Sequence, residues 1–177
     1  MALLEIRNLS LEFGMPPNSV RALDDVSFTI QKGETVCLVG ESGCGKSTLA
    51  MAIMGLLPLG NAKINGQILF YGKNLLTLRD SEMKKIRGRQ IAMIFQDPMT
   101  SLNPFMTVCD QIAEQIIQHT GKTKKAAFKK ALDLLISVGI PNPIERIHRY
   151  PHEFSGGMRQ RVMIACALSC EPKLLIA

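Results

Sequence analysis

The run from Gly40 to Ser47, which reads Gly-Glu-Ser-Gly-Cys-Gly-Lys-Ser, constrains the fold more than any other feature. It fits the pattern G-x-x-x-x-G-K-[ST], in which glycines let a loop curl so that its N–H groups face phosphate oxygens. A short apolar stretch, 35–39, precedes it and is predicted to be a strand buried on both faces. A helix is predicted from about Lys46 to Leu57, which places a helix N-terminus behind the bound anion. The run therefore predicts a nucleoside triphosphate site.

The chemistry of this loop assigns a role to several of its positions. Lys46 is expected to bridge the β- and γ-phosphates, and the Ser47 hydroxyl to ligate Mg²⁺. Cys44 is a candidate for oxidation because a helix N-terminus lowers the pKa of a thiol, although a tolerated small residue is the favoured interpretation. The residues expected to contact nucleotide here are Gly40, Glu41, Ser42, Gly43, Cys44, Gly45, Lys46, Ser47 and Thr48.

A second helix with uncovered backbone donors is predicted about a hundred residues later, in the run Glu153–Arg161. Ser155 is a plausible N-cap, and Gly156 and Gly157 leave the first helical N–H groups accessible. Taken alone, Ser-Gly-Gly is common, and a capped helix with no ligand is the better interpretation of these three residues.

The rest of the sequence predicts an α/β fold. Alternating apolar residues over Leu3–Phe13 predict an edge strand, and 91–95 and 174–177 predict buried strands. A turn is predicted at Met15–Asn18. The patterning from Thr107 to Ser169 is mainly helical, and its spacing predicts one apolar helix face with Ile112, Ile116 and Ile117 and another with Leu132, Leu135, Ile136 and Val138. We expect a β-rich lobe with the phosphate loop at 1–97, a helical region at 98–170 and the start of a further strand at 171–177.

Composition excludes several classes of protein. Apolar residues make up 46% and charged residues 20%, a globular balance, and no apolar run reaches the roughly 20 residues of a membrane span. The absence of a basic leader predicts a cytosolic chain. The five cysteines form no CxxC pair, which argues against zinc. The net charge of +6 comes largely from five lysines between 122 and 130, interpreted as a solvated helix face, and 5% aromatic residues without Trp oppose nucleic-acid binding.

Taken together, the two glycine-rich segments resemble the ATP-binding cassette family. Ser-Gly-Gly followed by Arg-Gln-Arg is similar to the family's signature motif, usually Leu-Ser-Gly-Gly-Gln, with Phe154 and Met158 replacing the leucine and the final glutamine. Gln96 matches the family's Q-loop after a buried strand, which ends at Asp97-Pro98. Phe13 stands where the family stacks an aromatic ring on adenine, and a core residue is nearly as good an interpretation. The resemblance implies a P-loop NTPase fold with an N-terminal antiparallel β subdomain, a helical insertion and a sheet that is incomplete at its C-terminal end.

Two longer stretches, Gln96–Pro104 and Tyr150–Val162, resemble the oligopeptide, dipeptide and nickel importer branch of that family. This implies an energy-coupling ATPase subunit, peripheral to the cytoplasmic face of the cell membrane. The implied partners are membrane permease subunits, a second ATPase subunit and, indirectly, a substrate-binding protein, without nucleic acid. The cargo implied by the branch is a peptide or nickel.

The resemblance also implies a mechanism. Two cassettes pack head to tail, and each ATP lies between Lys46 and Ser47 of one subunit and residues 155–157 of the other. The contacting residues of the second subunit are then Ser155, Gly156 and Gly157. Gln96 is the expected catalytic residue, which helps to place Mg²⁺ and water.

The segment Leu174–Ala177 resembles the start of the family's Walker B strand, whose Asp and Glu, together with a later switch histidine, are not in the sequence. His119, His148 and His152 precede the signature and are no substitute. We therefore expect a fragment or truncated product that retains weak nucleotide binding without turnover. The alternatives are a soluble cassette ATPase of translation or DNA repair, a nonfunctional remnant and, remotely, a P-loop kinase.

Overall fold

The structure, a computed structural model, describes all residues except 1, 15–17, 59, 61 and 98–100. The chain divides into two compact units, residues 1–84 and 85–177. The boundaries that the sequence predicts at 97 and 170 divide the chain by function, and they stay a prediction. Most of the predicted turn at 15–18, and the strand end at Pro98, fall outside the described residues. No helix in the described part of the chain is long and apolar enough to cross a membrane.

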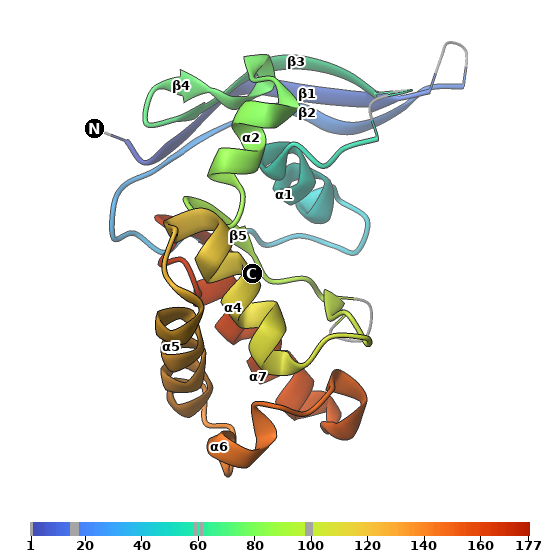
Figure 1. The fold of residues 1–177 in the computed structure, drawn as a ribbon. Helices are drawn as coiled ribbons and strands as arrows, with labels where there is room; N and C mark the ends of the chain where they lie inside the picture. The colour runs from blue at the N-terminus through green and yellow to red at the C-terminus, as the bar shows by residue number, and fades with distance from the viewer. Residues whose placement is uncertain (1, 15–17, 59, 61, 98–100) are drawn as a thin grey trace. The chain divides into compact units, whose positions relative to one another are not determined.

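The first unit is built on an antiparallel sheet with strand order β2-β1-β3-β4 (Figure 1). The prediction of an edge strand at the N-terminus is wrong, because β1 pairs with β2 on one side and with β3 on the other. Alternating apolar residues indicate that one face of a strand is buried, but they do not indicate whether the strand lies at the edge of its sheet. The strands are β1 (Leu4–Phe13), β2 (Val20–Ile30), β3 (Ala62–Phe70) and β4 (Lys73–Asn74).

One face of β1 supplies much of the core of the first unit. The side chains of Leu4, Ile6, Leu9 and Leu11 are each no more than 1% exposed. The register between β1 and its two neighbours shifts between Ile6 and Ser10, where Asn8 adopts a positive φ of 46°. The apolar face stays in the core across this irregularity, because Leu9 and Leu11 are buried after it as Leu4 and Ile6 are before it.

Helix α1 (Lys46–Met54) follows the glycine-rich loop and ends three residues before the predicted Leu57. Its C-cap is Gly55, which adopts the left-handed conformation with φ 62° and stops the helix before the proline is reached. The short helix η1 (Leu75–Thr77) and helix α2 (Asp80–Ile86) follow the sheet.

The predicted buried strand at 35–39 is wrong: the structure gives this segment no strand, and its side chains are exposed. Val39 is 91% exposed, Leu38 46% and Val36 39%. A parallel strand is buried only where neighbouring strands and covering helices meet it, and none of the described strands pairs with this segment. The described residues of its own unit therefore neither pair with this segment nor cover its apolar, β-branched side chains.

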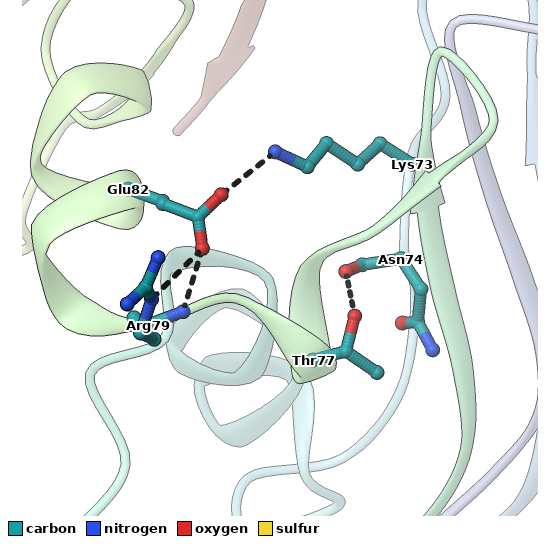
Figure 2. Close-up of polar contacts among 5 residues, drawn as sticks. All are labelled: Lys73, Asn74, Thr77, Arg79 and Glu82. Atoms are coloured by element: carbon teal, nitrogen blue, oxygen red, sulfur yellow. Dashed lines mark hydrogen bonds and ion pairs between the residues drawn. The ribbon is translucent and has the colours of Figure 1, made fainter.

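Polar contacts connect β4, η1 and the start of α2, as Figure 2 shows. The Glu82 carboxylate accepts hydrogen bonds from the backbone N–H of Arg79 at 3.2 Å and from the Lys73 ammonium at 3.1 Å. These contacts, the backbone one first, hold the pKa of Glu82 below its ordinary value. The Thr77 hydroxyl donates to the Asn74 carbonyl at 2.9 Å.

The second unit combines a two-stranded parallel sheet with a cluster of helices (Figure 1). Strand β6 (Leu174–Ile176) pairs in parallel with β5 (Ile91–Met93), which confirms that the chain returns to a sheet after the helical region. The chain therefore has the α/β fold that the sequence predicts. The helices are α4 (Val108–Thr120), α5 (Lys124–Ser137), α6 (Pro143–Arg146), η2 (Pro151–Glu153) and α7 (Gly156–Leu168).

The helices of the second unit share one apolar core. Ile112 and Ile116 of α4, Leu135 of α5 and Val162 of α7 are completely buried in it. The spacing of four residues between Ile112 and Ile116 places both on one face of α4, as the sequence predicts. Ile117, which the sequence predicts on the same face, is 37% exposed. Ile136, expected on the buried face of α5, is 55% exposed.

Candidate phosphate loop and second helix N-terminus

The glycine-rich loop before α1 is curled. Gly43 and Gly45 adopt left-handed conformations with φ values of 83° and 92°, and the N–H of Cys44 donates to the Glu41 carbonyl at 3.3 Å. Gly45 is also the N-cap of α1, so the loop leads directly into the first helical turn. Alternating left-handed glycines turn successive backbone N–H groups toward one concave side, the arrangement that binds anions.

Gly45 is required at its position by space as well as by conformation. A Cβ placed there would lie 2.5 Å from the carbonyl oxygen of Ala22 in β2 and 3.0 Å from a methyl carbon of Leu23. At Gly43 a Cβ would meet nothing within 4 Å. The loop is thus packed against β2 at Gly45 and open to solvent at Gly43.

The side chain of Lys46 folds back over the loop. Its Nζ atom donates to the carbonyl oxygens of Gly40 and Glu41, both at 2.7 Å, and to the Cys44 sulfur at 3.3 Å. The ammonium group therefore lies above the loop, at the N-terminus of α1. A cation in this position adds to the positive potential of the helix end.

The expected magnesium ligand, Ser47, is the second residue of α1, and its side chain is exposed. An accessible hydroxyl beside a curled loop with a lysine across it has the donor chemistry of a magnesium–triphosphate site, in which Mg²⁺ uses few protein ligands. Thr48 is partly buried, and Leu49 begins the buried face of the helix. The residues predicted at 40–48 are therefore together in one loop and the first turn of one helix.

The second predicted site, at the start of α7, is also accessible. Ser155 is the N-cap, and its hydroxyl oxygen accepts a hydrogen bond from the N–H of Met158 at 3.4 Å. Gly156 and Gly157 are exposed, and a Cβ at either would meet nothing within 4 Å. Phe154, which replaces the family's leucine, is 3% exposed and belongs to the helical core.

Residues that sequence reasoning missed hold this helix start in place. Glu153 accepts a hydrogen bond from the N–H of Tyr150 at 2.8 Å and one from the guanidinium of Arg149 at 2.7 Å. These two contacts, the backbone one first, lower the pKa of Glu153. Arg159 Nε donates to the Pro151 carbonyl at 2.8 Å. The signal for Glu153 was in the sequence, because a Glu three residues after a helix cap is the capping-box spacing.

The two remaining predicted residues lie elsewhere. Gln96 is exposed in a bend three residues after β5, in the second unit. Phe13 is the last residue of β1, partly buried, and pairs with Val20 and Ala62 in the first unit. Their roles stay predictions, as do those of residues 40–48 and 155–157.

Comparison with known proteins gives concordant results. Residues 23–177 match the family described as ABC transporter. The chain is 55% identical over 175 residues to the dipeptide transport ATP-binding protein DppD of Bacillus subtilis, covering 98% of this chain and 52% of that protein. It is 50% identical over 176 residues to the oligopeptide transport ATP-binding protein OppD of Escherichia coli, covering 99% and 52%. The chain thus spans about half the length of the curated relatives it matches.

Solved structures show the same fold. The chain superposes with a TM-score of 0.85 and 28% identity on a dimeric post-hydrolysis state of the ATP-binding cassette MJ0796 bound to ADP and Pi. A second dimeric structure of MJ0796, described as a bacterial ABC transporter cassette, gives a TM-score of 0.84. Each comparison covers 97% of this chain and 72% of the other.

Proposed function

The chain belongs to the ABC transporter family, and on that premise we propose that it is part of an ATP-binding subunit that powers peptide import. The relatives quoted above are ATP-binding proteins of dipeptide and oligopeptide transport, and the MJ0796 cassette was solved with ADP and Pi. The substrate class of the site is accordingly a nucleoside triphosphate, ATP. Binding and hydrolysis of ATP supply the energy for transport in this proposal.

The observation that carries the proposal is the curled loop with Lys46 across it. The loop contains two left-handed glycines and a lysine whose ammonium lies 2.7 Å from two loop carbonyl oxygens. A triphosphate entering the loop exchanges those carbonyls for phosphate oxygens as partners of the ammonium. Backbone N–H groups of residues 43–47 and the start of α1 then bind the remaining oxygens.

Mg²⁺ fits the residues at hand. The Ser47 hydroxyl is the ligand we propose in the loop, and Gln96 is the proposed second contact and the residue that orients water. When bound, Mg²⁺ supplies charge neutralisation at the β- and γ-phosphates. Thr48 and Phe13 are proposed to contact the α-phosphate side and the adenine ring.

We further propose that two copies, or two related subunits, enclose ATP between them. The exposed Ser155, Gly156 and Gly157 at the start of α7 supply N–H groups and a hydroxyl that fit a γ-phosphate. The dimeric state of MJ0796 in both of its structures supports this arrangement. The remaining partners in the proposal are permease subunits at the cytoplasmic face of the membrane, and the cargo is a peptide, with nickel as the less supported choice.

The test is equilibrium binding of a fluorescent ATP analogue in the presence of Mg²⁺. Lys46→Ala is expected to weaken binding by at least tenfold, because a charge-assisted contact to phosphate contributes about 1.5–3 kcal/mol. Lys32→Ala removes an exposed lysine outside the loop and is expected to leave affinity unchanged. Equal binding by wild type and Lys46→Ala would remove the basis of the proposal.

A soluble cassette ATPase is the alternative to a transport subunit. Co-purification separates the two classes: a transport subunit is recovered with membrane permease subunits and a translation factor with ribosomes. The identity of about 50% to named transport proteins over nearly the whole chain favours the first outcome.

A further inference from the structure

The exposed start of helix α7 is held by the residues on both sides of it. Phe154, directly before it, is buried in the helical core, and its N–H donates to the Pro151 carbonyl at 3.1 Å. Arg159, which follows the first turn, reaches back to the same carbonyl. Residues 155–157 lie between these two, and a Cβ at either of the glycines would meet nothing within 4 Å. The orientation of their N–H groups therefore depends on the residues that flank them.

The Arg159 guanidinium makes two contacts with the turn before the helix. Its Nε atom donates to the Pro151 carbonyl oxygen at 2.8 Å, and Nη2 donates to the His152 carbonyl oxygen at 3.3 Å. Because a guanidinium is planar and its donors have a fixed geometry, two such contacts define how the turn is oriented relative to the helix. Pro151 is buried, so Arg159 bonds to a part of the turn that is itself packed in the protein.

The charge of Arg159 is unfavourable for the helix and favourable for an anion. Arg159 is the fourth residue of α7, whose first turn contains no acidic residue. A cation near a helix N-terminus opposes the helix dipole, which is positive at that end. The same charge adds to the potential that attracts an anion to the helix start. The dipole of α7 therefore disfavours an arginine at this position, whereas a phosphate group at residues 155–157 favours one.

A second arginine of the same helix makes similar contacts at another place. Arg161 Nη1 donates to the carbonyl oxygens of Val138 at 2.8 Å and Gly139 at 3.1 Å. Val138 is the C-cap of α5. Both arginines thus connect α7 to two backbone carbonyls, but only Arg159 connects it to the turn that leads into residues 155–157. Arg161 is therefore a matched comparison for Arg159.

We propose that Arg159 is a positioning residue for the γ-phosphate of a nucleotide held in the loop of a second copy. By bonding to the carbonyls of residues 151 and 152, it fixes the direction in which α7 begins and so directs the N–H groups of the two glycines. The inference rests on the proposed function, in which residues 155–157 contact nucleotide across the interface. A misplacement of about 1 Å costs up to about a hundredfold in such a site.

The experiment measures how two copies associate with and without Mg²⁺ and ATP, by sedimentation velocity well below the melting temperature. Arg159→Met keeps the aliphatic length, removes both contacts and is expected to weaken nucleotide-dependent association by about tenfold or more. Arg161→Met is the control and is expected to associate within a few-fold of wild type. Binding of a fluorescent ATP analogue to dilute protein is expected to be equal in wild type and Arg159→Met, because the Lys46 loop is unchanged.

A mixture of two variants separates positioning at the site from a general loss of stability. In a pair of one Lys46→Ala copy and one Arg159→Met copy, both defects fall in the same nucleotide site. The other site then has an intact loop and an intact α7. We therefore expect the mixture to recover nucleotide-dependent association that each variant lacks alone. Mixing does not repair a copy that is simply unstable.

Several outcomes overturn the proposal. Association of Arg159→Met equal to that of wild type, an equal loss in Arg161→Met, or no recovery in the mixture each remove the assigned role. Arg159→Lys keeps the charge but has no donor at the position of Nε, so it is also expected to associate more weakly than wild type. Full association of Arg159→Lys assigns the effect to charge alone. If Arg159→Met does not fold, Arg159→Lys replaces it in every measurement.

Nucleotide binding keeps this inference distinguishable from the proposed function. Equal binding by wild type and Lys46→Ala contradicts the proposed function itself. Binding that depends on Lys46, without nucleotide-dependent association of wild type, leaves ATP binding standing and overturns both the arrangement of two copies and the role of Arg159.

Discussion

A single glycine in the phosphate loop is expected to be far more sensitive than its neighbour. Gly43→Ala and Gly45→Ala both place a side chain at a positive φ, which costs about 1–2 kcal/mol. Only Gly45→Ala also drives a Cβ into the Ala22 carbonyl, at 2.5 Å. We therefore predict a larger loss of stability and of ATP binding in Gly45→Ala, measured by urea unfolding and nucleotide titration. Equal losses in the two variants would show that packing against β2 is not what requires the glycine.

At the scale of elements, the start of helix α4 depends on one threonine. The Thr107 hydroxyl accepts from the N–H of Asp110 at 3.1 Å and donates to its carboxylate at 2.6 Å. Thr107→Ala removes both contacts and is predicted to lower the free energy of unfolding by about 1 kcal/mol. Thr107→Ser keeps the hydroxyl and is the control. Denaturant titration compares the two, and a serine variant as unstable as the alanine variant contradicts the assignment of the cap.

We predict that the turn before α7 makes the fold less stable at acid pH. The pKa of Glu153 is lowered from 4.5, so its ionised form stabilises the fold at pH above that value. This contribution is lost as the pH falls below 4.5 and through the folded-state pKa. Wild type should consequently lose more of its melting temperature between neutral pH and this range than Glu153→Gln. Glu145→Gln, on the exposed α6, is the matched removal of one carboxylate, and should follow the wild-type curve.

Local sequence rules predicted some elements well and others not. The helix starts at Lys46 and Gly156 follow from a glycine or serine cap, which acts within a few residues. Strand β6 was predicted from a short apolar run, and in the structure it pairs with β5. The failures at β1 and at 35–39 concern strand pairing, which depends on residues far away in the chain. The close approach of Gly45 and Ala22 could not be predicted for the same reason, since no pattern within the loop indicates that β2 packs against it.

For the molecule as a whole, the exposed segment before the phosphate loop is predicted to promote association. Leu38 and Val39 are 46% and 91% exposed, side by side in the sequence. Leu38→Gln/Val39→Gln is expected to reduce light scattering at high protein concentration and the binding of a hydrophobic dye. Val20→Gln/Ile144→Gln removes two separate apolar side chains that are 66% and 71% exposed, and is expected to change little. A larger effect of this second pair would place the associating surface elsewhere.

The ammonium of Lys46 has consequences for the energetics of ligand entry. Because it donates hydrogen bonds to the carbonyl oxygens of both Gly40 and Glu41 at 2.7 Å, the ammonium links two residues of the loop, and a phosphate group that binds there meets an ordered cation. Little backbone freedom then remains to be lost when a phosphate group binds. Removing the lysine untethers the backbone as well as deleting a charge, and the affinity lost in such a variant contains both contributions.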